Sequence, residues 1–126
     1  MAPEGLAPSK LKRRAEFVRV AGKGRKAPTP GLVLQALARG DDAPARLGFT
    51  VTKKVGNAVA RNRAKRRMRA LARSVIAAEG LAGWDYVLIG RAGETAGRGF
   101  GTMQAELSAA LAAVHGSGRA SAGGRQ

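Results

Sequence analysis

The chain has 126 residues, enough for one domain with a modest core and too few for two ordinary domains. It carries 23 Lys and Arg against 8 Asp and Glu, a net charge of +15, which favours a polyanionic partner such as nucleic acid. It has no cysteine, which excludes disulfides, thiolate metal sites and cysteine nucleophiles, and it shows neither a signal peptide nor a membrane-length apolar run, so we expect a cytoplasmic protein.

Composition divides the chain into three segments. Residues 1–9 are poor in order-forming side chains and are predicted to be a flexible N-terminus. Residues 116–126 are rich in Gly, Ser, Ala and Arg without periodicity, which is typical of a disordered basic tail. Residues 10–115 are therefore expected to form the single folded domain.

The first half of this domain predicts one helix and three extended segments. A short helix is expected over 15–21, ended by Gly22 and Gly24. Residues 26–31 are expected to be extended or turning, because Pro28 and Pro30 block a helix. Residues 32–37 and 46–52 have strand patterns and flank a turn sequence at 41–44, so the two strands are predicted to pair as a hairpin.

The second half predicts a long helix, a buried strand and a last helix. The long helix is expected from about residue 58 to 78, and the apolar run 84–89 indicates a strand covered on both faces. The last helix is expected over 102–115, with Thr102 as its cap. The order α-β-β-β-α-β-α predicts a small α/β (α+β) sandwich, a single small sheet with helices mainly on one side.

The glycine-rich stretch 90–101 separates the last strand from the last helix. It lacks the Gly-Lys-Ser/Thr ending and the G-x-G-x-x-G spacing of phosphate-binding loops. We expect a flexible connection, in which Arg91 and Arg98 are candidates for further phosphate contacts.

The long helix is the most informative segment. Every charged residue from Lys53 to Arg73 is basic, and no carboxylate occurs between Asp42 and Glu79. At 100° per residue, one face carries a narrow, alanine-rich apolar stripe and the rest carries arginine and lysine one turn apart. Like charges at that spacing repel by a few tenths of a kcal/mol per pair, so a merely solvated face is disfavoured and a polyanion-binding helix is favoured. The narrow stripe also disfavours insertion into lipid.

These residues resemble a known family. The run Lys53-Lys-Val-Gly-Asn-Ala-Val-Ala-Arg-Asn-Arg-Ala-Lys-Arg-Arg-Met-Arg69 is similar to the Arg-Asn-Arg signature of the bacterial ribonuclease P protein, the protein subunit of RNase P. The similarity extends from the Phe17 helix through Leu47-Gly-Phe-Thr-Val-Thr52 to Asp85-Tyr-Val-Leu-Ile89, and thus over the whole predicted domain. The placement of the run after this strand and at the start of a helix makes the resemblance specific.

The resemblance implies a left-handed β-α-β crossover and two binding surfaces. The catalytic RNA is expected to contact Lys53, Lys54, Arg61, Asn62, Arg63, Lys65, Arg66, Arg69 and Arg73. The 5′ leader of precursor tRNA is expected in a cleft between the first helix and the sheet, at Lys12, Arg13, Phe17, Val33 and Gln35. Ala21 and Gln35 stand where aromatic residues occur in other members, so the leader contact is predicted to rely less on stacking and more on Phe17 and charge.

No catalytic residue and no metal site are expected in the protein itself. The one histidine, His115, is predicted to be a residue at the end of the last helix, and the acids are scattered or sit in a turn. The resemblance implies that the RNA binds Mg²⁺ and performs the hydrolysis, with the protein as auxiliary subunit of this endoribonuclease. The expected partners are RNase P RNA and precursor tRNA, with no DNA and no membrane.

Two other classes stay open on the residues alone. A structural ribosomal protein would explain the charge and the tail, but not the Arg-Asn-Arg run in its strand–helix setting. A DNA-binding module could use the basic helix, but the sequence shows neither heptads nor an adjoining helix-turn-helix partner.

Overall fold

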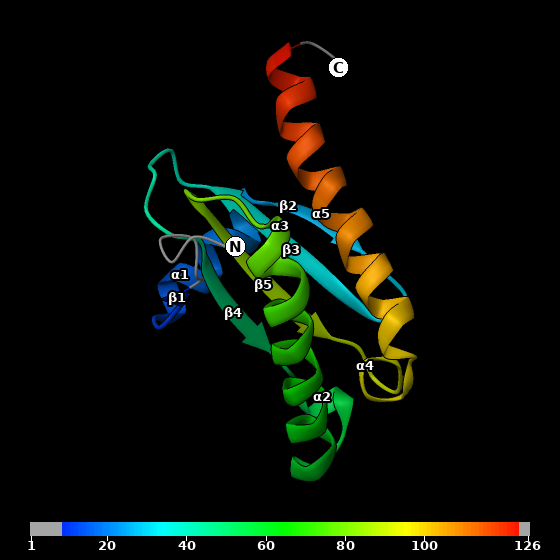
Figure 1. Cartoon of the computed structure of the whole chain (residues 1–126). Helices are drawn as coiled ribbons and strands as arrows, with labels where there is room; N and C mark the ends of the chain where they lie inside the picture. The colour runs from blue at the N-terminus through cyan, green and yellow to red at the C-terminus, as the bar shows by residue number, and fades with distance from the viewer. Residues whose placement is uncertain (1–8, 124–126) are drawn as a thin grey trace.

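The computed structural model describes residues 9–123, although the side chains of residues 9, 53 and 117–123 lie outside the description. The elements follow the predicted order α-β-β-β-α-β-α, with a two-residue strand added at the start and short helical turns added before the long helix and before the last helix (Figure 1). They are β1 (Ser9–Lys10), α1 (Arg14–Lys23), β2 (Arg25–Pro28), β3 (Leu32–Ala38), β4 (Arg46–Thr50), η2 (Lys53–Val55), α2 (Ala58–Leu71), η3 (Ala72–Ile76), α3 (Ala77–Glu79), β5 (Trp84–Gly90), α4 (Glu94–Gly97) and α5 (Phe100–Gly123).

The strands form one sheet in the order β1-β4-β5-β3-β2. β5 lies at its centre, antiparallel to β3 and parallel to β4. The predicted hairpin of β3 with β4 is therefore wrong, because the last strand of the chain inserts between them. The turn sequence at 41–44 fixes a reversal of the chain, but it does not fix which strands become neighbours. The continuous apolar run of β5 carries that information, since a strand covered on both faces belongs at the centre.

The connection from β4 through α2 to β5 is left-handed, as the family resemblance implied. In Figure 1, α2 lies in front of the sheet, β4 runs downward and β5 lies to its right. A right-handed crossover, the usual arrangement, would place β5 on the other side of β4.

Helices cover both faces of the sheet, and two apolar clusters result. α2 and α5 pack on one face, and α1 packs alone on the other (Figure 1). The alternation of β5 divides its side chains between the clusters: Tyr86 and Leu88 face α2 and α5, whereas Val87 and Ile89 face α1. The larger cluster is thus on the α2 side, as expected for a sheet with helices mainly on one face.

The last helix extends further than the sequence predicted. α5 continues to Gly123, whereas the prediction ended it at His115. Glycine lowers helix stability by about 1 kcal/mol relative to alanine but, unlike proline, does not block the backbone hydrogen bond. The segment after His115 contains no proline, so nothing in it stops the helix. Residues 116–123 therefore continue α5 instead of belonging to the disordered tail that the sequence predicted. Residues 1–8 and 124–126 lie outside the described part, so the flexibility and disorder expected of them stay predictions.

None of the helices in the described part of the chain combines the length and apolar character needed to cross a membrane.

Candidate nucleic-acid interface

The helix α2 begins at a polar cap and is held to the sheet by a short apolar stripe. The side chain of Asn57 accepts a hydrogen bond from the backbone N–H of Ala60 at 3.0 Å, which satisfies one of the free donors of the first turn. Ala64, Met68 and Leu71 are fully buried against the sheet. Because these three residues fix the rotation of the helix, most of the basic side chains on it face away from the sheet.

The outward side chains form a surface that we call the basic face. It consists of Arg61, Asn62, Arg63, Lys65, Arg66, Arg69 and Arg73, all predicted from the sequence to contact RNA. Asn62, Arg63, Arg66, Arg69 and Arg73 are exposed, and Lys65 is half-buried. Among the described residues, the ion pairs involve Arg19, Arg39, Arg46 and Arg98, and no member of the basic face. The basic face therefore has no acidic partner in the described part of the chain, and phosphate groups would relieve its repulsion.

Two arginines of the same helix are engaged within the protein. Arg61 is half-buried and donates to the carbonyl oxygen of Gly56 at 2.8 Å, which ties the start of α2 to the preceding turn. Arg67 donates to the carbonyl oxygens of Thr95, at 3.0 Å, and Arg98, and its guanidinium lies 5.7 Å from the centre of the Phe100 ring. Arg67 is not among the residues predicted from the sequence to contact RNA, and its contacts within the protein agree with that.

Lys53 and Lys54 lie in the 3-10 turn η2 that leads into α2. Lys54 is exposed at the approach to the basic face, and the side chain of Lys53 is outside the description.

The predicted leader-binding residues lie on the opposite, α1 face of the sheet. A side chain at Gly48 would place its Cβ 2.4 Å from Cε2 of Phe17, so glycine in β4 is what allows the ring to pack against the strand. Val33 is half-buried and Gln35 is only 7% exposed. Both belong to β3, which β5 separates from β4. The structure thus places Phe17, Val33 and Gln35 on one face, with Phe17 at the β4 side and the other two across β5.

Lys12 and Arg13 stand at the start of α1, with exposed side chains. Their backbone N–H groups both donate to Oε1 of Glu16, at 2.8 and 3.0 Å, which fixes the first turn. These hydrogen bonds, from Arg13 and then from Lys12, lower the pKa of Glu16 below its usual value. The two cations are therefore held at the end of α1 that leads from β1.

Two of the acidic side chains are held by ion pairs and hydrogen bonds within the protein. Asp85 is fully buried in β5, with Oδ1 at 2.6 Å from Nη1 of Arg39 and Oδ2 at 2.8 Å from Nη2 of Arg46. Asp41 accepts from the backbone N–H of Ala43 at 3.0 Å, which is the turn role predicted for it. Hydrogen bonds from Arg39 hold the pKa of Asp41 below its ordinary value. Within residues 9–123, no three acidic or histidine side chains gather as a metal site would require.

The role expected of Arg98 is corrected by its partners. Its guanidinium lies 2.6 Å from Oε2 of Glu106 and 3.4 Å from Oε1 of Glu94. The pair with Glu106 raises the pKa of Arg98 further. Arg98 is therefore neutralised within the protein and is not a free phosphate ligand, whereas Arg91 is exposed and makes no ion pair among the described residues.

His115 also differs from its prediction. It lies inside α5 rather than at its end, is 7% exposed, and its Nε2 is 2.7 Å from Oη of Tyr86. Tyr86 Oη also accepts from the backbone N–H of Leu81 at 2.9 Å. Burial raises the pKa of Tyr86 to about 12. The histidine belongs to the core, and only its helical neighbourhood could be inferred from the sequence.

Comparisons with known proteins agree with this arrangement. The family model for Ribonuclease P matches residues 7–115. The Ribonuclease P protein component of Gluconacetobacter diazotrophicus is 60% identical over 102 residues, covering 81% of this chain and 87% of that protein. The corresponding protein of Paramagnetospirillum magneticum is 51% identical over 109 residues, covering 83% and 81%.

Solved structures show the same fold. The RNase P protein from Thermotoga maritima superposes with a TM-score of 0.69 at 27% identity, covering 82% of this chain and 94% of that one. The Staphylococcus aureus RNase P protein gives a TM-score of 0.67 at 27% identity, covering 83% and 94%.

Proposed function

The chain belongs to the ribonuclease P protein family, and from that premise we propose that its basic face binds the catalytic RNA while the α1 face receives the 5′ leader of precursor tRNA. Membership makes the protein a subunit of the ribonuclease P endoribonuclease, with RNase P RNA as its partner. The residues that meet each RNA are the part that the proposal adds.

The observation that carries the proposal is the basic face without acidic partners. Arg66, Arg69 and Arg73 are exposed and free of ion pairs among the described residues, on a helix anchored by Met68 and Leu71. Arginine suits this role because its planar guanidinium can donate two parallel hydrogen bonds to one phosphate. A rigid helix that repeats this group at each turn matches the backbone of a folded RNA.

The protein's contribution to cleavage is binding and positioning. Asp85, Asp41 and Glu106 are all paired with arginine, and His115 is buried against Tyr86. These four side chains are engaged within the protein, so none of them is free to act as a general acid or base on a bound RNA. We therefore assign the hydrolysis, and the Mg²⁺ that it uses, to the RNA subunit, in the cytoplasm where precursor tRNA is made.

The test is cleavage at low Mg²⁺, where the RNA alone binds substrate poorly because phosphates repel each other. Purified protein is mixed with RNase P RNA and a precursor tRNA that carries a 5′ leader, and release of the leader is followed. We expect cleavage to require both protein and RNA under these conditions. Equal cleavage with and without the protein, at every Mg²⁺ concentration, would contradict the proposed role.

A further inference from the structure

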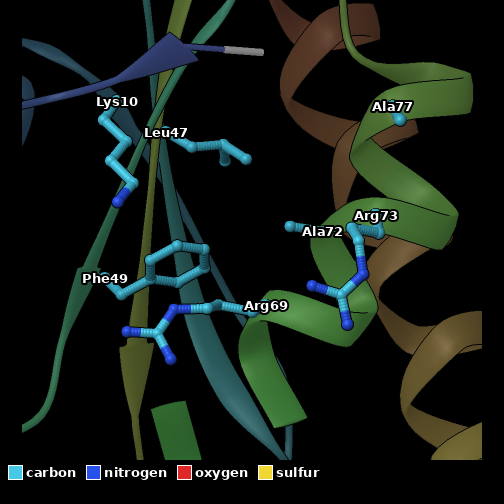
Figure 2. A pocket seen from close by; sticks show the side chains of 7 residues that line it. All are labelled: Lys10, Leu47, Phe49, Arg69, Ala72, Arg73 and Ala77. Carbon is cyan, nitrogen blue, oxygen red and sulfur yellow. The ribbon is translucent and has the colours of Figure 1, made fainter. Parts of the chain in front are cut away.

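A pocket of about 430 Å³ opens between the β4 edge of the sheet and the rod formed by α2, η3 and α3. It is lined by Lys10, Leu47, Phe49, Arg69, Ala72, Arg73 and Ala77 (Figure 2). Leu47 and Phe49 project from β4 toward the rod (Figure 2). Lys10 extends from β1 toward the ring of Phe49 (Figure 2). The pocket is thus an apolar hollow with cations at its rim.

The pocket exists because β1 covers little of β4 and because the rod faces it with small alanine side chains. β1 pairs with β4 only at Arg46 and Leu47, so β4 beyond Leu47 has no described strand on its outer edge. The rod presents Ala72 and Ala77 to the pocket, which leaves Phe49 half-buried rather than covered. The π-helical turn η3 begins at Ala72, and such turns are frequent at functional sites.

The charge around the pocket has one sign. Lys10, Arg69 and Arg73 are exposed, and no acidic side chain lines the pocket. None of these three makes an ion pair within the described residues. A smaller cavity of about 180 Å³ shares Lys10, Leu47, Phe49 and Arg69 with the pocket and adds Lys65 of the basic face. Its remaining lining residues, Leu11, Phe17 and Gly48, lie around the edge of β4 toward the α1 face. The cationic rim therefore continues from the pocket into the basic face.

An apolar floor with an aromatic ring and guanidinium groups at the rim is suited to a nucleotide. A base can lie against the ring, because every base has a π-face, while the rim binds the flanking phosphates. Inorganic phosphate would use the rim alone and leave the floor in water. A nucleotide with an unstacked base would use both parts of the pocket, because its base would lie on the apolar floor while its phosphates bound the cationic rim.

We propose that this pocket receives one unstacked nucleotide of the catalytic RNA, with its base against Phe49 and its phosphates on Arg69 and Arg73. The inference rests on the proposed function and names one contact within it. The catalytic RNA is favoured over the leader because Leu47 and Phe49 pack with the α2-side core, whereas Phe17 packs with the α1-side cluster. Arg69 and Arg73 also continue the row of the basic face.

The test compares two equal substitutions, Phe49→Leu and Phe100→Leu. Leucine retains apolar volume but removes the ring, and Phe100 is a half-buried ring on the α5 side, away from this pocket. The dissociation constant of each variant for RNase P RNA is measured without precursor tRNA. Loss of one stacked base predicts a weakening of roughly 5- to 150-fold for Phe49→Leu. Phe100→Leu should bind as the unchanged protein does.

Chemical probing of the RNA locates the contact. Wild-type protein should protect one unpaired base that Phe49→Leu leaves reactive, and Arg73→Ala, a change on the exposed side of the rod, should expose the same base. If Phe49→Leu proves unfolded by its melting curve, Arg73→Ala still decides the question. The inference would be overturned if the folded variants protected the same base as wild type does. It would also be overturned if the variants bound RNase P RNA normally and were weakened only in binding leader-bearing precursor tRNA. Both results would leave the role of the basic face intact, since that is tested by neutralising α2 itself.

Discussion

At the scale of single residues, Phe17 and Phe49 illustrate how one strand serves two surfaces. Phe17 packs on Gly48, and Phe49 is the next residue of β4, so the two rings lie on opposite sides of the sheet near its edge. The family resemblance predicted that Phe17 contacts the 5′ leader. The sequence offered no signal for Phe49 beyond strand alternation, because the pocket depends on how little of β4 is covered by β1.

Phe17→Leu should weaken binding of precursor tRNA with a long leader and leave binding of mature tRNA unchanged. One lost stacking contact predicts a change of roughly 5- to 150-fold, and leucine preserves most of the packing on Gly48. Binding is measured with the assembled ribonucleoprotein over a series of leader lengths. A variant whose affinity fell equally for mature tRNA would show a general defect rather than a leader contact.

Tyr86 predicts how stability responds to alkaline pH. Its folded pKa is raised to about 12 from an ordinary value near 10, so the fold favours the neutral phenol. The stabilisation is complete below about pH 10 and is lost as pH rises from about 10 toward 12. Since Tyr86 is the one tyrosine of the chain, tyrosinate absorbance follows it directly.

Tyr86→Phe is the control for this titration. It should lower the free energy of unfolding by about 1–3 kcal/mol at neutral pH, because Leu81 N–H and His115 Nε2 lose their hydrogen bonds to the Tyr86 hydroxyl. The variant should also lose less stability than wild type between pH 10 and 12. Parallel stability curves over that range would mean that Tyr86 is not the group responsible.

At the scale of elements, α2 combines a packing role and a binding role in adjacent residues. Arg66 is exposed and unpaired among the described residues, whereas Arg67 bonds to the α4 segment and lies over Phe100. The sequence predicted an RNA contact for Arg66 and none for Arg67. It could not predict the partners of Arg67, which are the carbonyl oxygens of Thr95 in α4 and of Arg98 directly after it, about 30 residues further along the chain.

Arg66→Gln should therefore affect RNA binding and not stability, whereas Arg67→Gln should affect stability and not RNA binding. Arg66→Gln should reduce the slope of log binding constant against log salt by about one and leave the melting temperature unchanged. Arg67→Gln should lower the melting temperature and leave the slope unchanged, since its bonds hold α4 to α2. The two quantities are measured by RNA titration at several salt concentrations and by thermal unfolding. An unchanged slope for Arg66→Gln would remove that residue from the interface.

At the scale of the whole molecule, the sequence predicted the order of elements better than their neighbours. The periodic segments were found, but β5 lies between β3 and β4, and no local pattern states where a strand inserts. The left-handed crossover came from resemblance, because general rules favour the opposite hand. The buried Asp85 with Arg39 and Arg46 was also missed, since these residues are far apart in the chain and meet only when β5 enters the sheet.

The chain carries a net charge of +15, and the described acids that form ion pairs do so with arginines outside the basic face, which leaves that face to an external anion. The whole account depends on that face meeting the catalytic RNA. A general loss of charge would also weaken RNA binding, so position must be separated from total charge.

The most direct measurement is the salt dependence of binding to RNase P RNA for two triple variants with the same net charge. One carries Lys65→Gln, Arg66→Gln and Arg69→Gln on α2, and the other carries Arg14→Gln, Lys23→Gln and Lys26→Gln on α1 and β2, all three exposed. The α2 variant should lose about three from the salt slope and most of its affinity, while the other stays close to wild type. Equal losses in the two variants, or no loss in the first, would contradict the account.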